Sequence, residues 1–163
     1  MRIGILSDTH DRLTRAALAV DRLVKEGAEA LVHCGDLTRP DMIVECAVLP
    51  FYFVFGNNDF DESGLRRAAA GVGAICLGRG GELELGGRRI AVTHGDSVRE
   101  MRRLSGLGPD YLLFGHTHQP ADARDGSTRL INPGALHRAP AWTVALLDLG
   151  TDALSLFTID GRA

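Results

Sequence analysis

The stretch RIGILSDTH, residues 2–10, is an apolar run that ends abruptly in polar residues. A short apolar run with such a boundary predicts a buried strand over Arg2–Ser7. The segment Thr14–Glu26 then places apolar side chains at helical spacing among charged ones, and Gly27 follows it as a helix-ending residue. Because Ala30–Cys34 is again apolar, the chain is expected to open with a strand, a helix and a second strand.

The same alternation continues through the first half, with helices expected over Asp41–Val48 and Asp61–Ala70 and a strand over Phe51–Phe55. This rhythm predicts a parallel sheet with helices outside it. The second half has mainly short strands between glycine-rich turns, and its predicted elements are strands at Ala74–Leu77, Gly81–Leu85, Arg89–Thr93, Tyr111–Phe114, Thr128–Ile131, Trp142–Leu149 and Ala153–Ile159, with a helix at Ser97–Leu104. Parallel units followed by antiparallel hairpins predict an α/β fold of two packed, mixed β-sheets flanked by helices.

Length and composition limit the class of protein. A chain of 163 residues, 45% hydrophobic, fits one domain over residues 1–163. We expect no signal peptide, and the longest uncharged stretch, 46–58, is too short for a bilayer, which needs about 20 residues. Three cysteines without a C-x-x-C pair make neither a disulfide framework nor a zinc ribbon and favour the cytoplasm. A net charge of −3 argues against nucleic-acid binding.

Polar clusters follow the predicted strands at the point where each strand ends. They are Asp8-Thr9-His10, Gly35-Asp36, Gly56-Asn57-Asn58-Asp59, Thr93-His94-Gly95-Asp96 and Gly115-His116-Thr117-His118. Each cluster alone is typical of a turn or a helix cap. Ligands of open α/β sheets bind beyond the carboxyl ends of the strands, so we expect these clusters to converge on one crevice.

The residue types in these clusters are those of a metal site. Asp8 and His10, like His116 and His118, are spaced i, i+2, which points both side chains of a pair to the same side of extended backbone. Carboxylates, imidazoles and an amide without thiolates suit Mn, Fe, Co, Ni or Zn. Because these side chains are too many for one ion, they predict two divalent ions, about 3.5–4 Å apart.

The order D-x-H, G-D, G-N-x-D, T-H-G-D, G-H-T-H resembles the calcineurin-like metallophosphoesterases, in particular their small single-domain bacterial and archaeal phosphodiesterase branch. The resemblance covers Asp8 to about Gly134 and implies a four-layer α/β/β/α sandwich. It also implies a ligand set in which Asp8, His10 and His118 hold one metal, Asn57, His94 and His116 hold the other, and Asp36 bridges them. We expect Mn first, with Ni, Fe, Co or Zn as alternatives.

The sequence departs from the wider family after the ligand asparagine. Many members carry a histidine there that acts on the leaving group or the phosphate, whereas this chain has Asn58, as the small branch often does. An amide can donate a hydrogen bond but has no titratable proton near neutral pH. Asp36 and Asn58 are the expected catalytic residues, and Asp59, Thr117 and Asn132 are expected to contact the substrate or to support the ligands. Asn132-Pro133-Gly134 matches a turn beside the family's active site, although it is equally a plain turn.

The resulting hypothesis is a phosphodiesterase in which a metal-bridging hydroxide attacks phosphorus in line. The alternative is a non-catalytic scaffold of the same fold, like one retromer subunit. A metallo-β-lactamase is disfavoured because its H-x-H-x-D-H run is absent, and an aspartyl phosphatase because Asp8 is not part of D-x-D. A small phosphate ester is the expected partner, without a membrane. Diester or monoester preference stays open, and the hairpin Trp142–Ile159 could provide the edge of a homodimer.

Two further histidines are expected outside the metal site. His33 lies inside a predicted strand beside Cys34, so we expect a buried structural role. His137 is followed by Arg138 in a predicted loop. It could reach the substrate, but a surface position is favoured. Trp142 is expected in the core.

Overall fold

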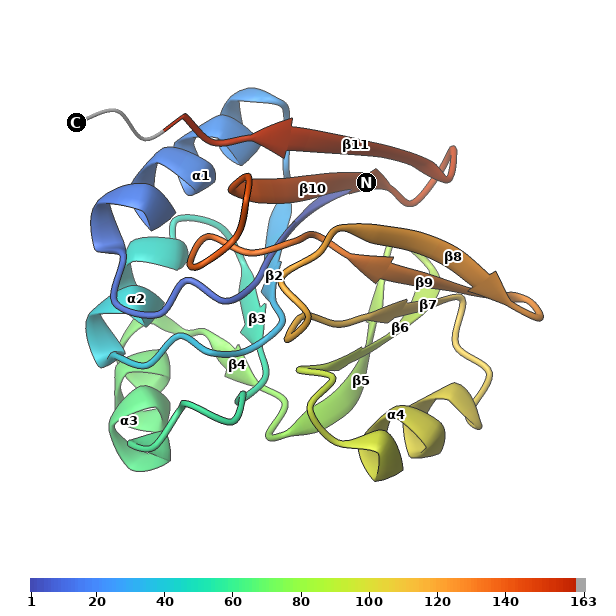
Figure 1. Cartoon of the computed structure of the whole chain (residues 1–163), viewed down its shortest axis with the longest axis horizontal. Coiled ribbons are helices and arrows are strands. Elements are labelled where there is room, and N and C mark those ends of the chain that lie inside the picture. The colour runs from blue at the N-terminus through green and yellow to red at the C-terminus, as the bar shows by residue number, and fades with distance from the viewer. Residues whose placement is uncertain (161–163) are drawn as a thin grey trace.

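A computed structural model describes residues 1–160 of the chain as two β-sheets packed face to face (Figure 1). The first sheet has six strands in the order β11-β10-β1-β2-β3-β4. Its strands are β1 (Arg2–Leu6), β2 (Ala30–His33), β3 (Phe51–Phe53), β4 (Ile75–Cys76), β10 (Thr143–Asp148) and β11 (Ala153–Thr158). β1 to β4 are parallel, whereas β10 pairs antiparallel with both β1 and β11.

The second sheet has five strands in the order β5-β6-β7-β9-β8. Its strands are β5 (Gly80–Leu85), β6 (Arg88–Thr93), β7 (Tyr111–Leu113), β8 (Ala121–Asp125) and β9 (Thr128–Asn132). The outer pairs β5–β6 and β8–β9 are antiparallel, and the central strands β6, β7 and β9 run parallel. The carboxyl ends of these central strands therefore lie at one edge of the sheet.

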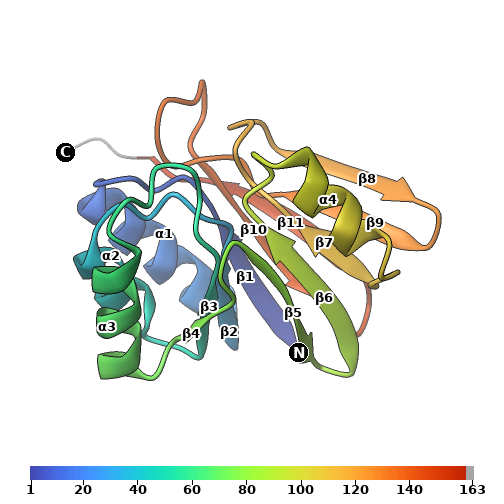
Figure 2. The same cartoon turned by 90° about the horizontal axis from the view of Figure 1, so that it is seen from below.

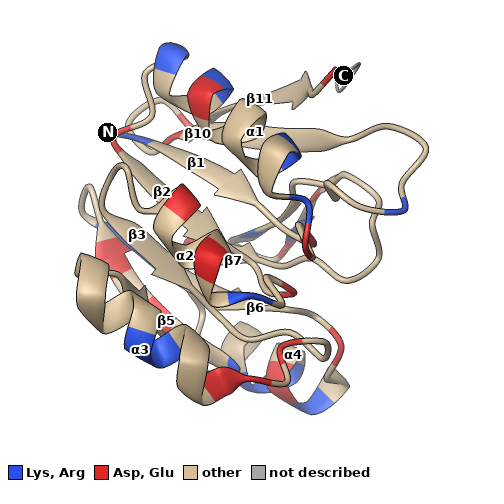
Figure 3. Ribbon diagram, turned by 90° about the vertical axis from the view of Figure 1, so that its left-hand side faces the viewer, with Lys and Arg blue, Asp and Glu red and all other residues tan. Residues whose placement is uncertain are grey.

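Helices cover the outer faces of both sheets, so the molecule has four layers (Figure 2). Helices α1 (Leu13–Lys25), α2 (Pro40–Cys46) and α3 (Glu62–Val72) lie over the first sheet, and α4 (Val98–Ser105) lies over the second. The predicted fold class, two mixed sheets flanked by helices, is confirmed. Charged residues gather on the helices and loops, while the ribbons of β1 and β2 carry little charge (Figure 3).

Side chains of the central strands point alternately to the two faces of the sheet, so they fill two apolar layers, one between the sheets and one under the helices. Ile3 and Ile5 of β1 are fully buried between the two sheets, together with Val92 of β6. The intervening Gly4 faces the helices, where a Cβ atom would lie 2.6 Å from Leu31 Cδ2 of β2 and 2.9 Å from Leu23 Cδ1 of α1. A side chain at Gly4 would therefore push α1 away from the sheet, and the glycine permits the close packing observed.

The structure corrects the sequence reading of the second half in two respects. β8 was not predicted, because all its residues are exposed and ADARD shows no apolar alternation. The two-residue turn Gly126-Ser127, a Gly-X pair typical of hairpins, could have revealed it. The two hairpins expected at Gly86-Gly87 and Gly150-Thr151 are present, but the emphasis on hairpins left out the parallel pairing of β6, β7 and β9 at the centre of the second sheet. Among residues 1–160, no helix combines the length and apolar character needed to cross a membrane.

The helix-facing layer provides a test of the packing. Leu31 is fully buried there, whereas Leu18 on α1 is 44% exposed. We expect Leu31→Ala to lower the free energy of unfolding by about 2–5 kcal/mol, because it removes buried apolar surface and leaves a cavity. Leu18→Ala, the matched control, should cost less than about 1 kcal/mol. Urea denaturation followed by circular dichroism measures both, and equal losses would contradict this packing.

Candidate metal centre

Pairing between β1 and β2 continues past the ends of both strands and brings two polar loops together. The Asp8 amide donates to the Gly35 carbonyl at 3.0 Å, and the His10 amide donates to the Asp36 carbonyl at 2.9 Å. The loop after β1 and the loop after β2 therefore lie side by side. This contact positions the first two sequence-predicted clusters against each other.

The second sheet supplies the histidines of the opposite wall. His94 follows β6, and the Gly115 amide, just beyond β7, donates to the His94 carbonyl at 2.9 Å. The His116 amide then donates to Asp8 Oδ2 at 3.1 Å, which joins the two sheets. Gly115 is required here, because a Cβ atom on it would overlap Ser7 Oγ and lie 2.8 Å from Asp8 Oδ2.

Left-handed backbone is concentrated in these loops. Non-glycine residues rarely adopt positive φ, and the cost is accepted mainly where surrounding contacts fix the conformation. Five of the predicted metal ligands nevertheless have it: Asp8 (φ 53°), His10 (48°), Asp36 (61°), His116 (66°) and His118 (58°). Such clustering of strain is typical of functional sites.

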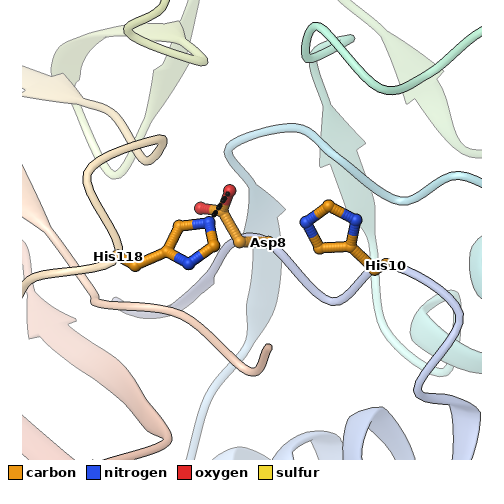
Figure 4. A group of neighbouring side chains, drawn as sticks. All are labelled: Asp8, His10 and His118. Atoms are coloured by element: carbon orange, nitrogen blue, oxygen red, sulfur yellow. Dashed lines mark ion pairs between the residues drawn. The ribbon is translucent and has the colours of Figure 1, made fainter. Parts of the chain in front are cut away.

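A first group of potential ligands consists of Asp8, His10 and His118, each of which offers one donor atom within 4.8 Å of the others. His118 Nε2 lies 3.1 Å from Asp8 Oδ1. In Figure 4 the carboxylate of Asp8 lies between the two imidazole rings, with the dashed line joining it to His118. The arrangement places two nitrogen donors and one oxygen donor around one point.

A second group consists of Asp8, Asp36 and His94. His94 Nε2 lies 3.5 Å from Asp36 Oδ2 and 3.9 Å from Asp8 Oδ1. The other ring nitrogen, Nδ1, lies 2.8 Å from the Cys34 carbonyl and must donate to it. His94 Nε2 therefore presents a lone pair toward the carboxylates, as a metal-ligating histidine does.

The buried polar atoms of this group fit a cation. Asp8 Oδ1 and His94 Nε2 are both buried, and neither has a hydrogen-bond partner. Leaving such atoms unpaired is costly, and buried carboxylates are normally compensated by a counter-charge or a metal. The donors are nitrogen and oxygen without sulfur, which suits a divalent ion of intermediate softness.

The remaining predicted ligands lie at the mouth of the same site. A cavity of about 300 Å³, here called the central cavity, is lined by His10, Asp36, Asn57, Asn58, His116, His118, His137 and Arg138. Asn57 and His116 are both exposed. The His116 ring packs edge-on against the His94 ring, with centroids 5.1 Å apart. The structure thus places all seven predicted ligands around one region.

The predicted catalytic residue Asn58 is bonded to Asp36. Its backbone amide donates to Asp36 Oδ1 at 2.8 Å and its side-chain amide donates to Asp36 Oδ2 at 2.7 Å. Burial would raise the pKa of Asp36, but the nearby His94 and these hydrogen bonds outweigh it and hold the pKa below its usual value. Asn58 therefore stabilises Asp36 as a carboxylate and fixes its orientation.

Asp59 lies behind Asp36 and is 1% exposed. Its carboxylate accepts backbone hydrogen bonds from Asp36 at 2.9 Å, Gly56 at 2.7 Å and Thr38 at 2.6 Å. Burial nevertheless raises the pKa of Asp59 above its usual value, and the bonds from Gly56 and Thr38 offset this only in part. Asp59 ties the loop after β3 to the loop after β2 without reaching the cavity.

Asn132 and Thr117 support the loop that carries His116 and His118. Asn132 is fully buried and donates from its side-chain amide to the Gly115 carbonyl at 2.8 Å and to Thr117 Oγ1 at 3.0 Å. Thr117 is exposed. The structure therefore gives Asn132 a positioning role, because its polar atoms already have partners inside the protein.

Sequence reasoning favoured a surface position for His137, and the structure corrects this. His137 is half-buried, lines the central cavity next to Arg138, and its ring centroid lies 4.5 Å from that of His10. The signal in the sequence was the position of His137 and Arg138 after a predicted strand. That strand, β9, runs parallel to β7 and therefore ends at the same edge of the sheet.

The buried histidine His33 fastens the first two loops together. Its Nδ1 accepts from the Gly35 amide at 3.1 Å, so Nε2 carries the proton and donates to Thr9 Oγ1 at 3.0 Å. Burial lowers the pKa of His33 to about 3, so the ring stays neutral. Trp142 is half-buried and packs against the helix-facing core.

Comparison with known proteins shows one consistent group of relatives. Residues 1–152 match the calcineurin-like phosphoesterase superfamily domain. The chain is 32% identical over 139 residues to a phosphodiesterase of Methanocaldococcus jannaschii, covering 82% of this chain and 83% of that protein. It is also 33% identical over 144 residues to a probable metallophosphoesterase of Methanothermobacter thermautotrophicus, covering 83% and 77% of the two chains.

Solved structures extend the comparison to the fold. An archaeal phosphodiesterase superposes with a TM-score of 0.87 at 28% identity, covering 97% of this chain and 99% of that one. Vps29 of Entamoeba histolytica, solved in complex with zinc, superposes with a TM-score of 0.67 at 19% identity, covering 99% and 95%. At that identity the second likeness concerns the fold alone.

The neutral state of His33 predicts a pH dependence of stability. A histidine in the unfolded chain takes up a proton below about pH 6.5, whereas folded His33 does so only near pH 3. The stability that neutral His33 gives the folded state is therefore fully present above pH 6.5 and is lost as the pH falls toward 3. Between pH 7 and pH 5 this loss should be about 2 kcal/mol. Urea denaturation at pH 7 and pH 5, with chelator present, measures the free energy of unfolding. Between these pH values the decrease should be about 2 kcal/mol smaller for His33→Gln than for wild type, and equal decreases would contradict the buried neutral ring.

Proposed function

We propose that this chain, which belongs to the calcineurin-like phosphoesterase superfamily, is a phosphodiesterase that depends on two divalent metal ions. Membership of the superfamily and the 32% identity to a phosphodiesterase support phosphoester hydrolysis, and the similarity to the archaeal phosphodiesterases favours diesters over monoesters. The single observation that carries the two-metal proposal is that Asp8 Oδ1 and His94 Nε2 have no hydrogen-bond partner, although both atoms are buried where the two ligand groups meet.

The ligands are assigned to the two ions as follows. Asp8, His10 and His118 would hold one, and Asn57, His94 and His116 would hold the other. Asp36 would bridge them, because its Oδ2 lies 3.6 Å from His10 Nε2 and 3.5 Å from His94 Nε2, one histidine from each set. Asp8 is the member common to both clusters of donor atoms, so its carboxylate also lies between the sets.

When bound, two divalent ions would lower the pKa of a water, so that it attacks phosphorus as hydroxide, and would neutralise phosphate charge in the in-line displacement. The residues of the chain prepare the site for this chemistry. Asn58 and Asp59 hold the Asp36 carboxylate and its loop. The Cys34 carbonyl fixes the His94 ring. This preorganisation lowers the cost of reorientation during the reaction.

The other features of the proposal concern the setting. Manganese is the favoured metal, with nickel, iron, cobalt or zinc as alternatives of the same donor preference. The partner is a small phosphate ester, with no nucleic acid or membrane. Among the described residues the three cysteines Cys34, Cys46 and Cys76 are free, which supports a cytoplasmic location. A homodimer that uses the edge of the Trp142–Ile159 hairpin is proposed from the sequence pattern alone.

The alternative function is a non-catalytic scaffold with the same fold. The likeness to Vps29 concerns the fold alone, and the complete set of donors around the cavity favours the enzyme. Elemental analysis and a chromogenic diester assay on the same preparation separate the two. Bound metal with turnover supports the phosphodiesterase, and a metal-free, inactive protein after loading would support the scaffold.

Removing the charge of Asp36 tests the bridge. Asp36→Asn should lower the metal content toward one ion per chain or less and reduce turnover of bis(p-nitrophenyl) phosphate at least 100-fold, because an amide has one neutral oxygen donor and cannot bridge two ions as a carboxylate does. Elemental analysis and initial rates measure the two effects. Asp41→Asn, at an exposed carboxylate on α2, is the matched control and should change neither. A variant that is active with two bound metals would refute the bridge.

The absence of a histidine at position 58 predicts strong dependence on the leaving group. Because the Asn58 amide cannot supply a proton, hydrolysis of substituted phenyl phosphodiesters should slow steadily as the pKa of the leaving phenol rises. A plot of log(kcat/KM) against that pKa measures the slope. A flat plot would indicate that another group protonates the leaving oxygen.

A further inference from the structure

We infer that Arg138 binds the phosphoryl group of the substrate, and that the loop 137–141 is a phosphate-recognition element of the site. This inference rests on the proposed function, because it names the group that holds the substrate of that site. Arg138 follows the turn after β9 and is not one of the metal ligands implied by the family motifs.

Charge singles out Arg138 among the described residues that line the central cavity. It is the one side chain there with a permanent positive charge, and Asp36 is the one carboxylate. A phosphate ester entering this cavity is an anion. A guanidinium can donate two parallel hydrogen bonds to two phosphate oxygens, which gives both affinity and orientation.

Backbone contacts place Arg138 directly beside a proposed metal ligand. Its carbonyl lies 3.3 Å from His118 Nδ1, and the same imidazole presents Nε2 to Asp8 Oδ1 at 3.1 Å. Arg138 also has a left-handed backbone, with φ 45°, a feature that it shares with the loops bearing Asp8, Asp36 and His118. Strain of this kind persists where the surrounding structure holds a residue for a purpose.

The loop that carries Arg138 is fastened at its base. The Leu136 amide donates to the Ser7 carbonyl at 3.3 Å, and the Arg15 guanidinium donates to the Leu136 carbonyl. The same guanidinium stacks on the Trp142 ring, with its Cζ atom 3.1 Å from the ring centroid. Arg15 thereby joins Leu136 and Trp142, the residues on either side of the loop. The backbone that carries Arg138 is therefore fixed at both ends.

A second contact orients the residue next to Arg138. Arg12 Nε donates to His137 Nδ1 at 3.3 Å, which ties the start of the loop to the segment before α1. The loop is thus fixed against both the first strand's loop and the first helix. A preorganised cation loses less entropy when it binds an anion than a free surface arginine does.

Binding of inorganic phosphate to the full-length, manganese-loaded protein tests this inference without turnover. Isothermal titration calorimetry should give a Kd about tenfold weaker for Arg138→Ala than for wild type, with Arg138→Lys in between, because lysine keeps the charge but not the paired donors. Alanine and arginine have similar backbone preferences, so the strain at this position is unchanged. Arg99→Ala, at an exposed arginine on α4, is the matched control and should bind phosphate as wild type does.

Elemental analysis and thermal melting should show equal metal content and folding in all four proteins. With bis(p-nitrophenyl) phosphate, Arg138→Ala should lose about tenfold in kcat/KM, mainly through KM. An Arg138→Ala variant that binds phosphate as tightly as Arg99→Ala overturns the inference. If wild type binds phosphate in an Arg138-dependent way but hydrolyses no diester, the inference stands and the proposed function fails.

Discussion

The parallel hydrogen bonding between β1 and β2 does not stop where the strands stop, and the rest of the site depends on that continuation. Two more backbone bonds, from Asp8 to Gly35 and from His10 to Asp36, carry the pairing into the loops. They bring two carboxylates into one buried space before any ligand is present. Every other residue of the centre is placed relative to this pair of loops.

The second sheet completes the centre because its own strands β6 and β7 end at the same level. Gly115 lets the loop after β7 pass close to Ser7, and the His116 amide then donates to the Asp8 carboxylate. Buried polar side chains fix each of these loops by hydrogen bonds. His33 connects the loops after β1 and β2, and Asp59 connects the loops after β2 and β3. Asn132 holds the loop after β7. Their hydrogen bonds explain how strained backbone and unpaired donor atoms are tolerated together.

Much of this could be predicted from the sequence, and what was missed has physical causes. Apolar runs that end in Asp, Asn or His revealed the strands of the core and the polar clusters beyond them, because burial and chemistry change at the same residue. β8 was missed because an exposed edge strand has no apolar pattern. Tertiary contacts were also invisible, so the hydrogen bonds from Asn58 to Asp36 and the packing of the His137 ring against the His10 ring required the structure.

The site lies across the seam between the two sheets, and this has a consequence for how the molecule is assembled. The backbone bond from His116 to Asp8 joins residues 108 positions apart, and the donors of both metal groups come from both sheets. Contacts of such long sequence separation form late, after the chain entropy of closing large loops has been overcome. Neither sheet alone can build a high-affinity centre. Tight metal uptake should therefore report that the two halves have docked in their native arrangement, and the bound ions would hold them there.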